Sequence, residues 1–299
     1  MRKLLIHLDS SELASVFDRI VAYDGGADEV LSYSGITAHA VRDLVHGAIF
    51  TRGPKDLYNT AIFIGGSGMT AGEQLLAAVQ KTFFGPFRVS VMLDSNGSNT
   101  TAVAAVAKIL QTVGDVRGRH AVVTAGTGPV GTRAAGLLAR AGARVTITSR
   151  HADEAERVVA QIRDRFGGSV DSVVVPDPSR LGSALGDADM LLNAGPAGVQ
   201  LVPRDAWTSA RTLRVVADLN AVPPLGIEGV EVTDAGADRH GITTFGAVGI
   251  GNFKMKVHKR CIAKLFERND QVLDAESIGD VAREVVQAAP SPPSVPPPA

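Results

Sequence analysis

Cysteine is nearly absent from the 299-residue sequence, in which Cys261 is the single example. One cysteine excludes a disulfide framework inside the chain and a cysteine-rich zinc site. The seven histidines show no metal-ligand spacing such as H-x-x-x-H, so we expect no metal. A chain with one thiol is typical of a reducing compartment, and we expect a cytoplasmic protein.

Excess charge, aromatic side chains and long apolar runs are also scarce. The formal net charge is −1 and aromatic residues make up 5% of the chain. These values argue against a basic nucleic-acid-binding face and against stacking platforms for single strands. The apolar start of the chain is broken by His7 and ended by Asp9, and no later run is long enough to cross a bilayer. We therefore expect neither nucleic acid nor a membrane as a partner.

The sequence does contain a regular alternation of short apolar runs and helical patterns, with 45% hydrophobic residues. Such alternation predicts βαβ units and parallel sheets, and therefore an α/β fold. The predicted strands cover residues 3–8, 60–64, 87–93, 120–125, 144–149, 170–175, 190–193 and 214–219. The predicted helices cover residues 12–22, 38–46, 70–83, 100–113, 130–141, 153–166, 253–266 and 275–288.

Two glycine-containing segments suggest how the chain divides into domains. The polar segment 113–119 (VGDVRGR) precedes a new strand, and segment 245–251 (FGAVGIG) precedes a long helical stretch. We predict one α/β domain from residues 1–104 plus 247–288 and a second from residues 105–246. The proline-rich end, residues 289–299, cannot build a core and is predicted to be disordered.

The strongest local motif is a G-x-G-x-x-G sequence that follows a predicted strand and precedes a predicted helix. Gly126 would permit a tight turn, Gly128 would let the backbone approach a pyrophosphate, and Gly131 would let the helix pack on the strand. The helix N-terminus offers free N–H groups to the phosphates. The motif predicts a Rossmann-type, doubly wound parallel sheet in the second domain, with a dinucleotide bound by Gly126, Thr127, Gly128, Pro129, Val130 and Gly131. A glycine-rich turn without a ligand is the alternative.

The end of the next strand indicates which dinucleotide is bound. An NAD-binding strand usually ends in Asp or Glu, which accepts hydrogen bonds from the ribose 2′-OH. Here the strand runs into Thr148, Ser149 and Arg150, and no carboxylate appears before Asp153. Ser149 and Arg150 fit a ribose 2′-phosphate, so the sequence predicts NADP. The alternative is that Arg150 is a solvated loop residue.

Two later loops should lie at the same edge of the second sheet, where doubly wound folds bind ligands. The loop 193–198 (NAGPAG) follows one predicted strand, and the loop 218–224 (DLNAVPP) follows the next. Their small residues would let the nicotinamide and its ribose approach the backbone. We expect contacts to the cofactor from Asn193, Ala194, Gly195 and Asn220.

Motifs spread along the chain also form a recognisable set. They are Asp18 with YDGG at 23–26, TAIFIGG at 60–66, FGPFR at 84–88, MLDSNGSNTT at 92–101, GTGPVG at 126–131, ADLN at 217–220 with PPLGI at 223–227, and GIGNFKMK at 249–256. From about residue 3 to the helix near residue 288, the chain resembles the NADP-dependent methylene-tetrahydromethanopterin dehydrogenases of methylotrophic bacteria, some of which also act on methylene-tetrahydrofolate. The resemblance implies two α/β domains with a cleft between them, NADP as cofactor, and a homo-oligomer, specifically a trimer.

The implied reaction moves a hydride from the methylene bridge of a reduced pterin to C4 of NADP⁺. It leaves a methenyl cation spread over two ring nitrogens. No proton leaves at this step, so the protein aligns donor and acceptor and tunes the electrostatics. The resemblance indicates Lys256 as the catalytic residue. Because an ammonium opposes a forming cation, Lys256 must be neutralised by a carboxylate, act on a pterin carbonyl, or lie some distance from the reacting carbon.

The resemblance also implies which residues contact the pterin. Ser98 and Asn99 could equally cap the helix that begins near Thr100. Lys254 and Lys256 should point to different faces of their helix, and Phe17 is expected in the core. The residues expected to bind the pterin are Asp18, Tyr23, Asp94, Asn96, Ser98, Asn99 and Lys254.

Two other functions would use the same motifs. An NADP-dependent dehydrogenase of another small substrate, such as a keto acid, would need a proton donor, for which Lys256 and Asp94 are available. A non-catalytic NADP-sensing protein would keep GTGPVG but would not need glycine- and asparagine-rich loops in the first domain. Tetrahydromethanopterin and tetrahydrofolate share the reacting ring, so both stay open as substrates.

Overall fold

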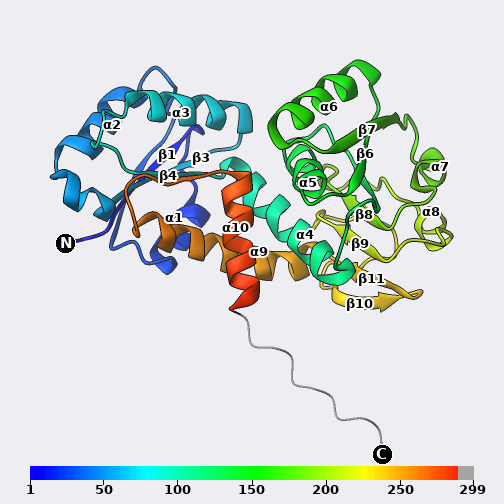
Figure 1. The fold of residues 1–299 in the computed structure, drawn as a ribbon. Coiled ribbons are helices and arrows are strands. Elements are labelled where there is room, and N and C mark those ends of the chain that lie inside the picture. Colours follow the sequence, from blue (N-terminus) through cyan, green and yellow to red (C-terminus); the bar gives the residue numbers. More distant parts are fainter. Residues whose placement is uncertain (289–299) are drawn as a thin grey trace, which may run out of the picture.

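The computed structural model describes residues 1–288, and its two β-sheets form the two lobes seen in Figure 1. The first sheet has five parallel strands in the order β12-β4-β3-β1-β2. These are β1 (Leu4–Asp9), β2 (Glu29–Tyr33), β3 (Thr60–Gly65), β4 (Ser90–Leu93) and β12 (Val272–Leu273). The proline-rich end, for which the sequence predicts disorder, lies outside the described residues.

The second sheet has seven strands in the order β10-β11-β9-β8-β5-β6-β7. All neighbouring strands are parallel except β10 and β11, which pair as an antiparallel hairpin at one edge. The chain starts at β5 and moves outward in both directions, so the predicted doubly wound α/β fold is confirmed. The strands are β5 (His120–Thr124), β6 (Arg144–Ser149), β7 (Ser169–Val174), β8 (Met190–Asn193), β9 (Val215–Asp218), β10 (Ala235–Arg239) and β11 (Ile242–Phe245).

Helices cover the sheets, and α4, α9 and α10 lie between the lobes in Figure 1. The helices are α1 (Val16–Asp24), α2 (Val41–Phe50), α3 (Met69–Thr82), α4 (Ser98–Val113), α5 (Pro129–Arg140), α6 (Ala152–Phe166), α7 (Leu181–Leu185), α8 (Arg204–Thr208), α9 (Ala247–Leu265) and α10 (Ala275–Gln287). Short 3-10 turns occur at Pro54–Asn59, Ser95–Gly97 and Pro178–Arg180. Within residues 1–288, no helix combines the length and apolar character that a bilayer crossing requires.

Helix α4 ties the two lobes together. One continuous apolar core includes Phe63 of β3, Ile109 of α4, Val257 of α9 and Val123 of β5. The domain boundary predicted at residue 104 falls inside this helix. The lobes are therefore joined by packed side chains as well as by the chain itself.

The structure contains four strands that the apolar pattern did not predict. β2 is a partly exposed edge strand and β10 is largely exposed, so neither shows the continuous apolar run of a buried parallel strand. The other two, β11 and β12, have four and two residues.

Four predicted elements start three or more residues away from their predicted positions. Helix α1 begins at Val16 rather than at residue 12, and α2 begins at Val41 rather than at residue 38. The strand predicted at 87–93 begins at Ser90, because Phe84 and Phe87 exchange backbone hydrogen bonds and close a turn before it. Helix α9 begins at Ala247 rather than at residue 253. Its Gly249 packs on the Asp234 carbonyl, from which an added Cβ would lie only 1.9 Å. Gly246 and Gly249 are thus needed for close packing at the start of α9, whereas Gly251 has open space around it.

Candidate active site

The carboxyl ends of β1, β3 and β4 adjoin a cavity of about 420 Å³ in the first lobe. Parallel strands bring their carboxyl ends to one edge of the sheet, where α/β proteins bind ligands. The cavity brings together three of the predicted pterin-binding residues, Asp18, Asn96 and Lys254. Its lining consists of Asp9, Ser11, Leu13, Ser15, Phe17, Asp18, Gly66, Ser67, Asn96, Gly97 and Lys254.

Lys254 of α9 supplies a cation to this cavity. Its Nζ lies 5.7 Å from the centre of the Phe17 ring. It also lies so close to Gly97 that an added Cβ there would be 2.5 Å away. Phe17 is 51% exposed, so the expectation that it belongs to the core is wrong. Ser15 caps the N-terminus of α1 and also lines the cavity. The first turn of α1 therefore forms part of the cavity wall.

Two carboxylates balance this cation. Asp94 is fully buried at the end of β4, and burial raises its pKa to about 6 against the opposing charge of Lys254. Burial likewise raises the pKa of Asp18 to about 6, against a hydrogen bond with Ser15 and the charge of Lys254. Lys254 thus stabilises the ionised form of both carboxylates.

Asp94 also caps α4. Its Oδ1 accepts the Thr100 N–H at 2.9 Å, and its Oδ2 accepts the Thr100 hydroxyl at 2.6 Å. The capping that the sequence analysis considered for Ser98 or Asn99 is therefore performed by Asp94. This explains why a charged side chain stays ordered at a buried strand end.

A buried histidine lies behind Asp94. His258 follows Lys254 by one helical turn on α9, and its Nδ1 lies 4.0 Å from Asp94 Oδ2. Its ring stacks on Phe63 with the ring centres 5.5 Å apart. Burial, aided by the charge of Lys254, lowers the pKa of His258 to about 3. The imidazole is therefore neutral at physiological pH.

A group of metal-ligand type lies beside the cavity. One ligand atom each from His7, Asp9 and Asp18 lies within 4.8 Å of the others, an arrangement that their spacing in the chain does not reveal. The Oδ1 and Oδ2 of Asp9 accept backbone N–H groups from Ser11 at 2.8 Å and Ser15 at 2.9 Å. Asp9 thus holds the loop that leads into α1, and we assign no metal to this group.

Asn99 does not present its side chain to the cavity. It is fully buried, and its Nδ2 donates to the Leu93 carbonyl at 2.6 Å and to Asp274 Oδ1 at 2.8 Å. Its Oδ1 accepts a hydrogen bond from Arg133 Nε at 2.5 Å. The amide predicted to contact the pterin is thus fully engaged inside the protein.

Four other predicted residues also lie outside the lining, including the fully buried Asp94. Ser98 is buried, and Tyr23 is 40% exposed at the end of α1. Lys256 is exposed on α9 at a different angle from Lys254, as their two-residue spacing predicts. Burial, together with the charge of Lys256, lowers the pKa of Lys108 on α4. The structure therefore places Lys254, rather than Lys256, beside the carboxylates.

A second cavity, of about 260 Å³, opens at the carboxyl ends of β5, β6 and β8 and is lined by Thr127 of the glycine motif. A Cβ added at Gly126 would lie 2.4 Å from Ile147 Cβ, and one at Gly131 would lie 2.6 Å from the Ala125 carbonyl oxygen. At Gly128 the nearest atom would be 3.5 Å away, which leaves room for a ligand at the backbone. The residue with left-handed backbone is Ala125, with φ of 50°, and Gly126 follows it inside the turn, where its missing Cβ allows the close approach to Ile147.

Arg150 stands at the opening of this second cavity. Ser149, Arg150, His151 and Glu154 are all part of the lining. Arg150 is exposed and forms no ion pair within residues 1–288. Its guanidinium is therefore available to a phosphate.

The side chains of Asn193 and Asn220 hold the two loops at the ends of β8 and β9. Asn193 accepts the Thr124 hydroxyl at 2.6 Å and donates to Asp218 Oδ1 at 2.8 Å. Asn220 Oδ1 accepts the Val222 N–H at 2.9 Å. The lining contains Pro196 from the first loop, but not Asn193, Ala194, Gly195 or Asn220. These asparagines therefore hold the two loops through internal hydrogen bonds and do not line the cavity.

Comparisons with known proteins agree with the resemblance. The family model described as methylene-tetrahydromethanopterin dehydrogenase, N-terminal, matches residues 16–96. The bifunctional protein MdtA of Methylorubrum extorquens is 47% identical over 285 residues, covering 95% of this chain and 99% of its own. The NAD(P)-dependent methylenetetrahydromethanopterin dehydrogenase of the same organism is 32% identical over 293 residues, covering 95% of this chain and 99% of its own.

A solved structure shows that the fold itself is shared more widely. Shikimate 5-dehydrogenase from Listeria monocytogenes superposes with a TM-score of 0.58 at 14% identity, covering 95% of this chain and 96% of its own. At this identity the similarity concerns the two-lobed fold alone.

Proposed function

Because the chain belongs to the methylene-tetrahydromethanopterin dehydrogenase family, we propose that it oxidises methylene-tetrahydromethanopterin with NADP⁺. A C–H bond of the methylene bridge breaks, and the hydrogen leaves with its electron pair to nicotinamide C4. The products are NADPH and the methenyl cation. Methylene-tetrahydrofolate carries the same reacting ring and is the second substrate that we propose. The observation that carries the proposal is the Lys254, Asp18 and Asp94 group at the sheet edge of the first lobe.

Lys254 can bind the pterin without opposing the reaction. An ammonium without a counter-charge would raise the energy of the methenyl cation that forms near it, because both groups are positively charged. Here Asp18 and Asp94 accompany Lys254, so the group carries a net negative charge when both are ionised. We propose that Lys254 donates a hydrogen bond to a pterin acceptor, while the carboxylates favour the cationic product. Lys254 thereby takes the role that the sequence analysis gave to Lys256.

We place the phosphates of NADP at the second cavity. Gly128 leaves space against the backbone, and α5 begins immediately afterwards with Pro129, so its first N–H groups can receive a pyrophosphate. Arg150 and Ser149 would hold the 2′-phosphate through charge-assisted hydrogen bonds. When bound, NADP⁺ supplies the hydride acceptor. The protein's part is to fix the ring near the methylene carbon and to exclude water.

A matrix of initial-rate assays tests this proposal. Purified protein is mixed with each methylene-pterin and each oxidised nicotinamide, and absorbance of the reduced nicotinamide is followed. We expect turnover with methylene-tetrahydromethanopterin and a preference for NADP⁺ over NAD⁺. Reduction of a keto acid without pterin oxidation would instead support the small-substrate dehydrogenase. Nucleotide binding without any hydride transfer would support the NADP-sensing protein.

We further propose a cytoplasmic homo-oligomer, with the trimer that the resemblance implies. Val16 and Ile20 on α1 are 70% and 56% exposed, and Leu13 just before the helix is 83% exposed. Apolar side chains grouped in this way fit a contact between subunits. Size-exclusion chromatography with light scattering should give three times the chain mass, and a monomer mass would overturn this part.

A further inference from the structure

Arg133 joins the nucleotide helix to the pterin-binding lobe. It lies one turn into α5, the helix that begins with the glycine motif, and it is only 5% exposed. Its guanidinium donates from three nitrogens to three elements. The acceptors are Pro129 O at 3.1 Å in α5, Asn99 Oδ1 at 2.5 Å in α4, and Glu73 Oε1 at 2.6 Å in α3.

Asn99 connects this guanidinium to the turn that lines the pterin cavity. It follows Gly97, which lies against Lys254 Nζ, by two residues. Its Nδ2 also donates to the Leu93 carbonyl at the end of β4 and to Asp274, the N-cap of α10. One amide therefore fixes the start of α4 relative to three other elements.

We propose that Arg133 and Asn99 are a positioning pair that sets the distance between the nicotinamide ring and the methylene carbon. This inference rests on the proposed function. The coenzyme is held by the first turn of α5, and the pterin is held by the turn at 94–97. Hydrogen bonds link Pro129 to Arg133 and Arg133 to Asn99, which follows Gly97 by two residues in the chain. Hydride transfer is sensitive to this distance, and a shift of about 1 Å can lower a rate by about 100-fold.

The chemistry of arginine suits this task. A planar guanidinium donates to several acceptors in fixed directions, whereas a lysine ammonium is a point charge on a flexible stem. Lysine at position 133 could keep the ion pair with Glu73, but it could not keep all three hydrogen bonds in place. Arg133→Lys therefore tests whether the positive charge at this position is sufficient or whether the three hydrogen bonds of the guanidinium are also needed.

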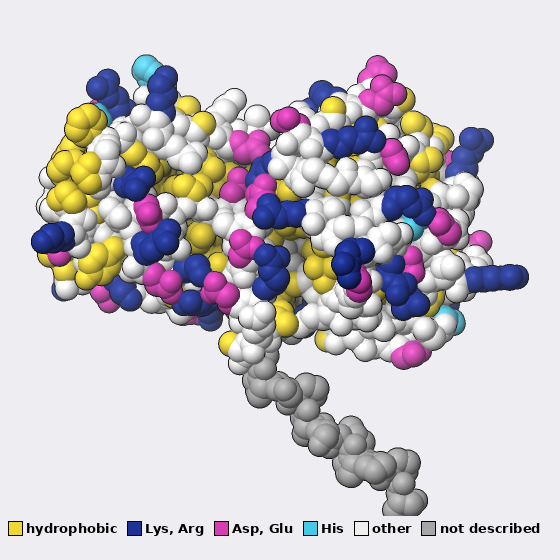
Figure 2. All heavy atoms as spheres, in the orientation of Figure 1, with side chains coloured by type: hydrophobic (Ala, Val, Ile, Leu, Met, Phe, Trp, Pro, Cys, Tyr) yellow, Lys and Arg dark blue, Asp and Glu magenta, His cyan; other side chains and the backbone are white. Residues whose placement is uncertain are grey.

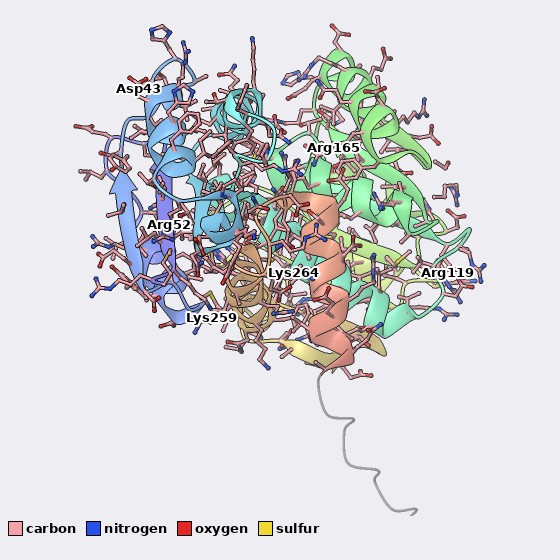
Figure 3. The ribbon with its side chains drawn as sticks, turned by 60° about the vertical axis from the view of Figure 1, so that its left-hand side comes forward. Asp43, Arg52, Arg119, Arg165, Lys259 and Lys264 are labelled. Atoms are coloured by element: carbon pink, nitrogen blue, oxygen red, sulfur yellow. The ribbon has the colours of Figure 1, made fainter. Side chains whose placement is uncertain are left out.

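Arg165 provides a matched control. It lies on α6, and Figure 3 shows it where the two lobes meet. It pairs with Glu276 and Asp274, each at 2.7 Å, and its Nη1 lies 3.8 Å from Glu73. Figure 2 shows acidic and basic side chains gathered between the two lobes. Arg165 thus crosses the same interface as Arg133 and shares the carboxylates of Glu73 and Asp274 with Arg133 and Asn99, but it bonds to neither Pro129 nor Asn99. Its replacement therefore removes the shared charge and leaves the Arg133–Asn99 hydrogen bond in place.

The test compares Arg133→Met, Arg133→Lys and Arg165→Met with the wild-type protein. The rate of the hydride step is measured in single turnovers with protio and dideuterio methylene substrate. Affinity for NADP⁺ is measured by titration, and folding by thermal unfolding. Hydrogen–deuterium exchange of residues 94–101 is recorded with and without NADP⁺, since this readout needs nucleotide binding but no turnover.

For Arg133→Met we expect a hydride step slower by about 10- to 100-fold, with a larger isotope effect on turnover and nearly unchanged NADP⁺ affinity. Arg133→Lys should recover part of the rate, and Arg165→Met should mainly lower thermal stability. NADP⁺ should slow exchange at residues 94–101 in the wild-type protein, but not in Arg133→Met.

Two outcomes would overturn the inference. One is a hydride step in the folded Arg133 variants as fast as in the wild-type protein. The other is NADP⁺-induced protection of residues 94–101 that persists in them. Should Arg133→Met fail to fold, Arg133→Lys decides by the same readouts. A wild-type protein without hydride transfer would refute the proposed function instead, and the exchange experiment would still decide whether Arg133 couples the two sites.

Discussion

Replacement of the buried Asp94 by asparagine should stabilise the protein at neutral pH while slowing hydride transfer. Burial raises the pKa of this carboxyl from 3.8 to about 6, so its ionised form is disfavoured in the folded state. A shift of about 2 units, at about 1.4 kcal/mol each, corresponds to about 3 kcal/mol of unfolding free energy. Asparagine keeps the cap on α4, because its oxygen can accept the Thr100 N–H and its nitrogen can donate to the Thr100 hydroxyl.

The stabilisation should depend on pH in a defined direction. Because the folded-state pKa exceeds the unfolded one, the favourable contribution of Asp94 is complete below about pH 4 and is lost as the pH rises through about 6. Urea unfolding followed by circular dichroism should therefore give similar unfolding free energies for Asp94→Asn and wild type at pH 4. At pH 8 the variant should be more stable by up to about 3 kcal/mol. Its hydride transfer should be slower, because Lys254 loses a counter-charge.

Asp234→Asn is a control of opposite sign. Asp234 is also buried, and burial acts to raise its pKa, but hydrogen bonds from Arg239, the Glu231 N–H and Thr244 outweigh this effect and lower it. Asp234→Asn should therefore destabilise the protein at neutral pH, with a smaller effect as the pH falls through the lowered pKa. A pH-independent difference between Asp94→Asn and wild type would refute the reasoning about burial.

Three further substitutions test the site. Lys254→Met should lower kcat by about 10- to 100-fold through loss of a charged hydrogen bond, while the exposed Lys256→Met stays within about twofold; equal losses in steady-state assays would contradict the assignment. Arg150→Leu should raise KM for NADP⁺ by about 10- to 100-fold and leave KM for NAD⁺ nearly unchanged, and an unaltered preference would remove Arg150 from the 2′-phosphate site. Gly131→Ala should abolish NADP⁺ binding in calorimetric titrations, because the new Cβ would lie 2.6 Å from the Ala125 carbonyl. Wild-type NADP⁺ affinity in that variant would contradict this expectation, because it would show that the loop moves to accommodate the added Cβ.

Local features of the sequence were enough to predict the five strands β5–β9 of the second sheet and the glycine motif. The apolar runs of β5, β8 and β9 are continuous because these strands are buried on both faces. The glycine motif is equally local, since strand β5, the turn and helix α5 follow one another within residues 120–140. Partly exposed strands such as β2 and β10 lack this signal, so the same reasoning missed them.

The pterin side depended on contacts between residues far apart in the chain. The two-residue spacing of Lys254 and Lys256 shows that they occupy different faces of α9, but not which face meets the cavity. The packing of α9 against α1 and β4 decides which face meets the cavity, because it brings Lys254 near Asp18 and Asp94. The periodicity of apolar residues was therefore enough to predict most helices and strands, because it reflects burial along a single segment of the chain. Only the tertiary structure decided which charges meet, because the energy of a buried ion depends on groups that other segments bring to it.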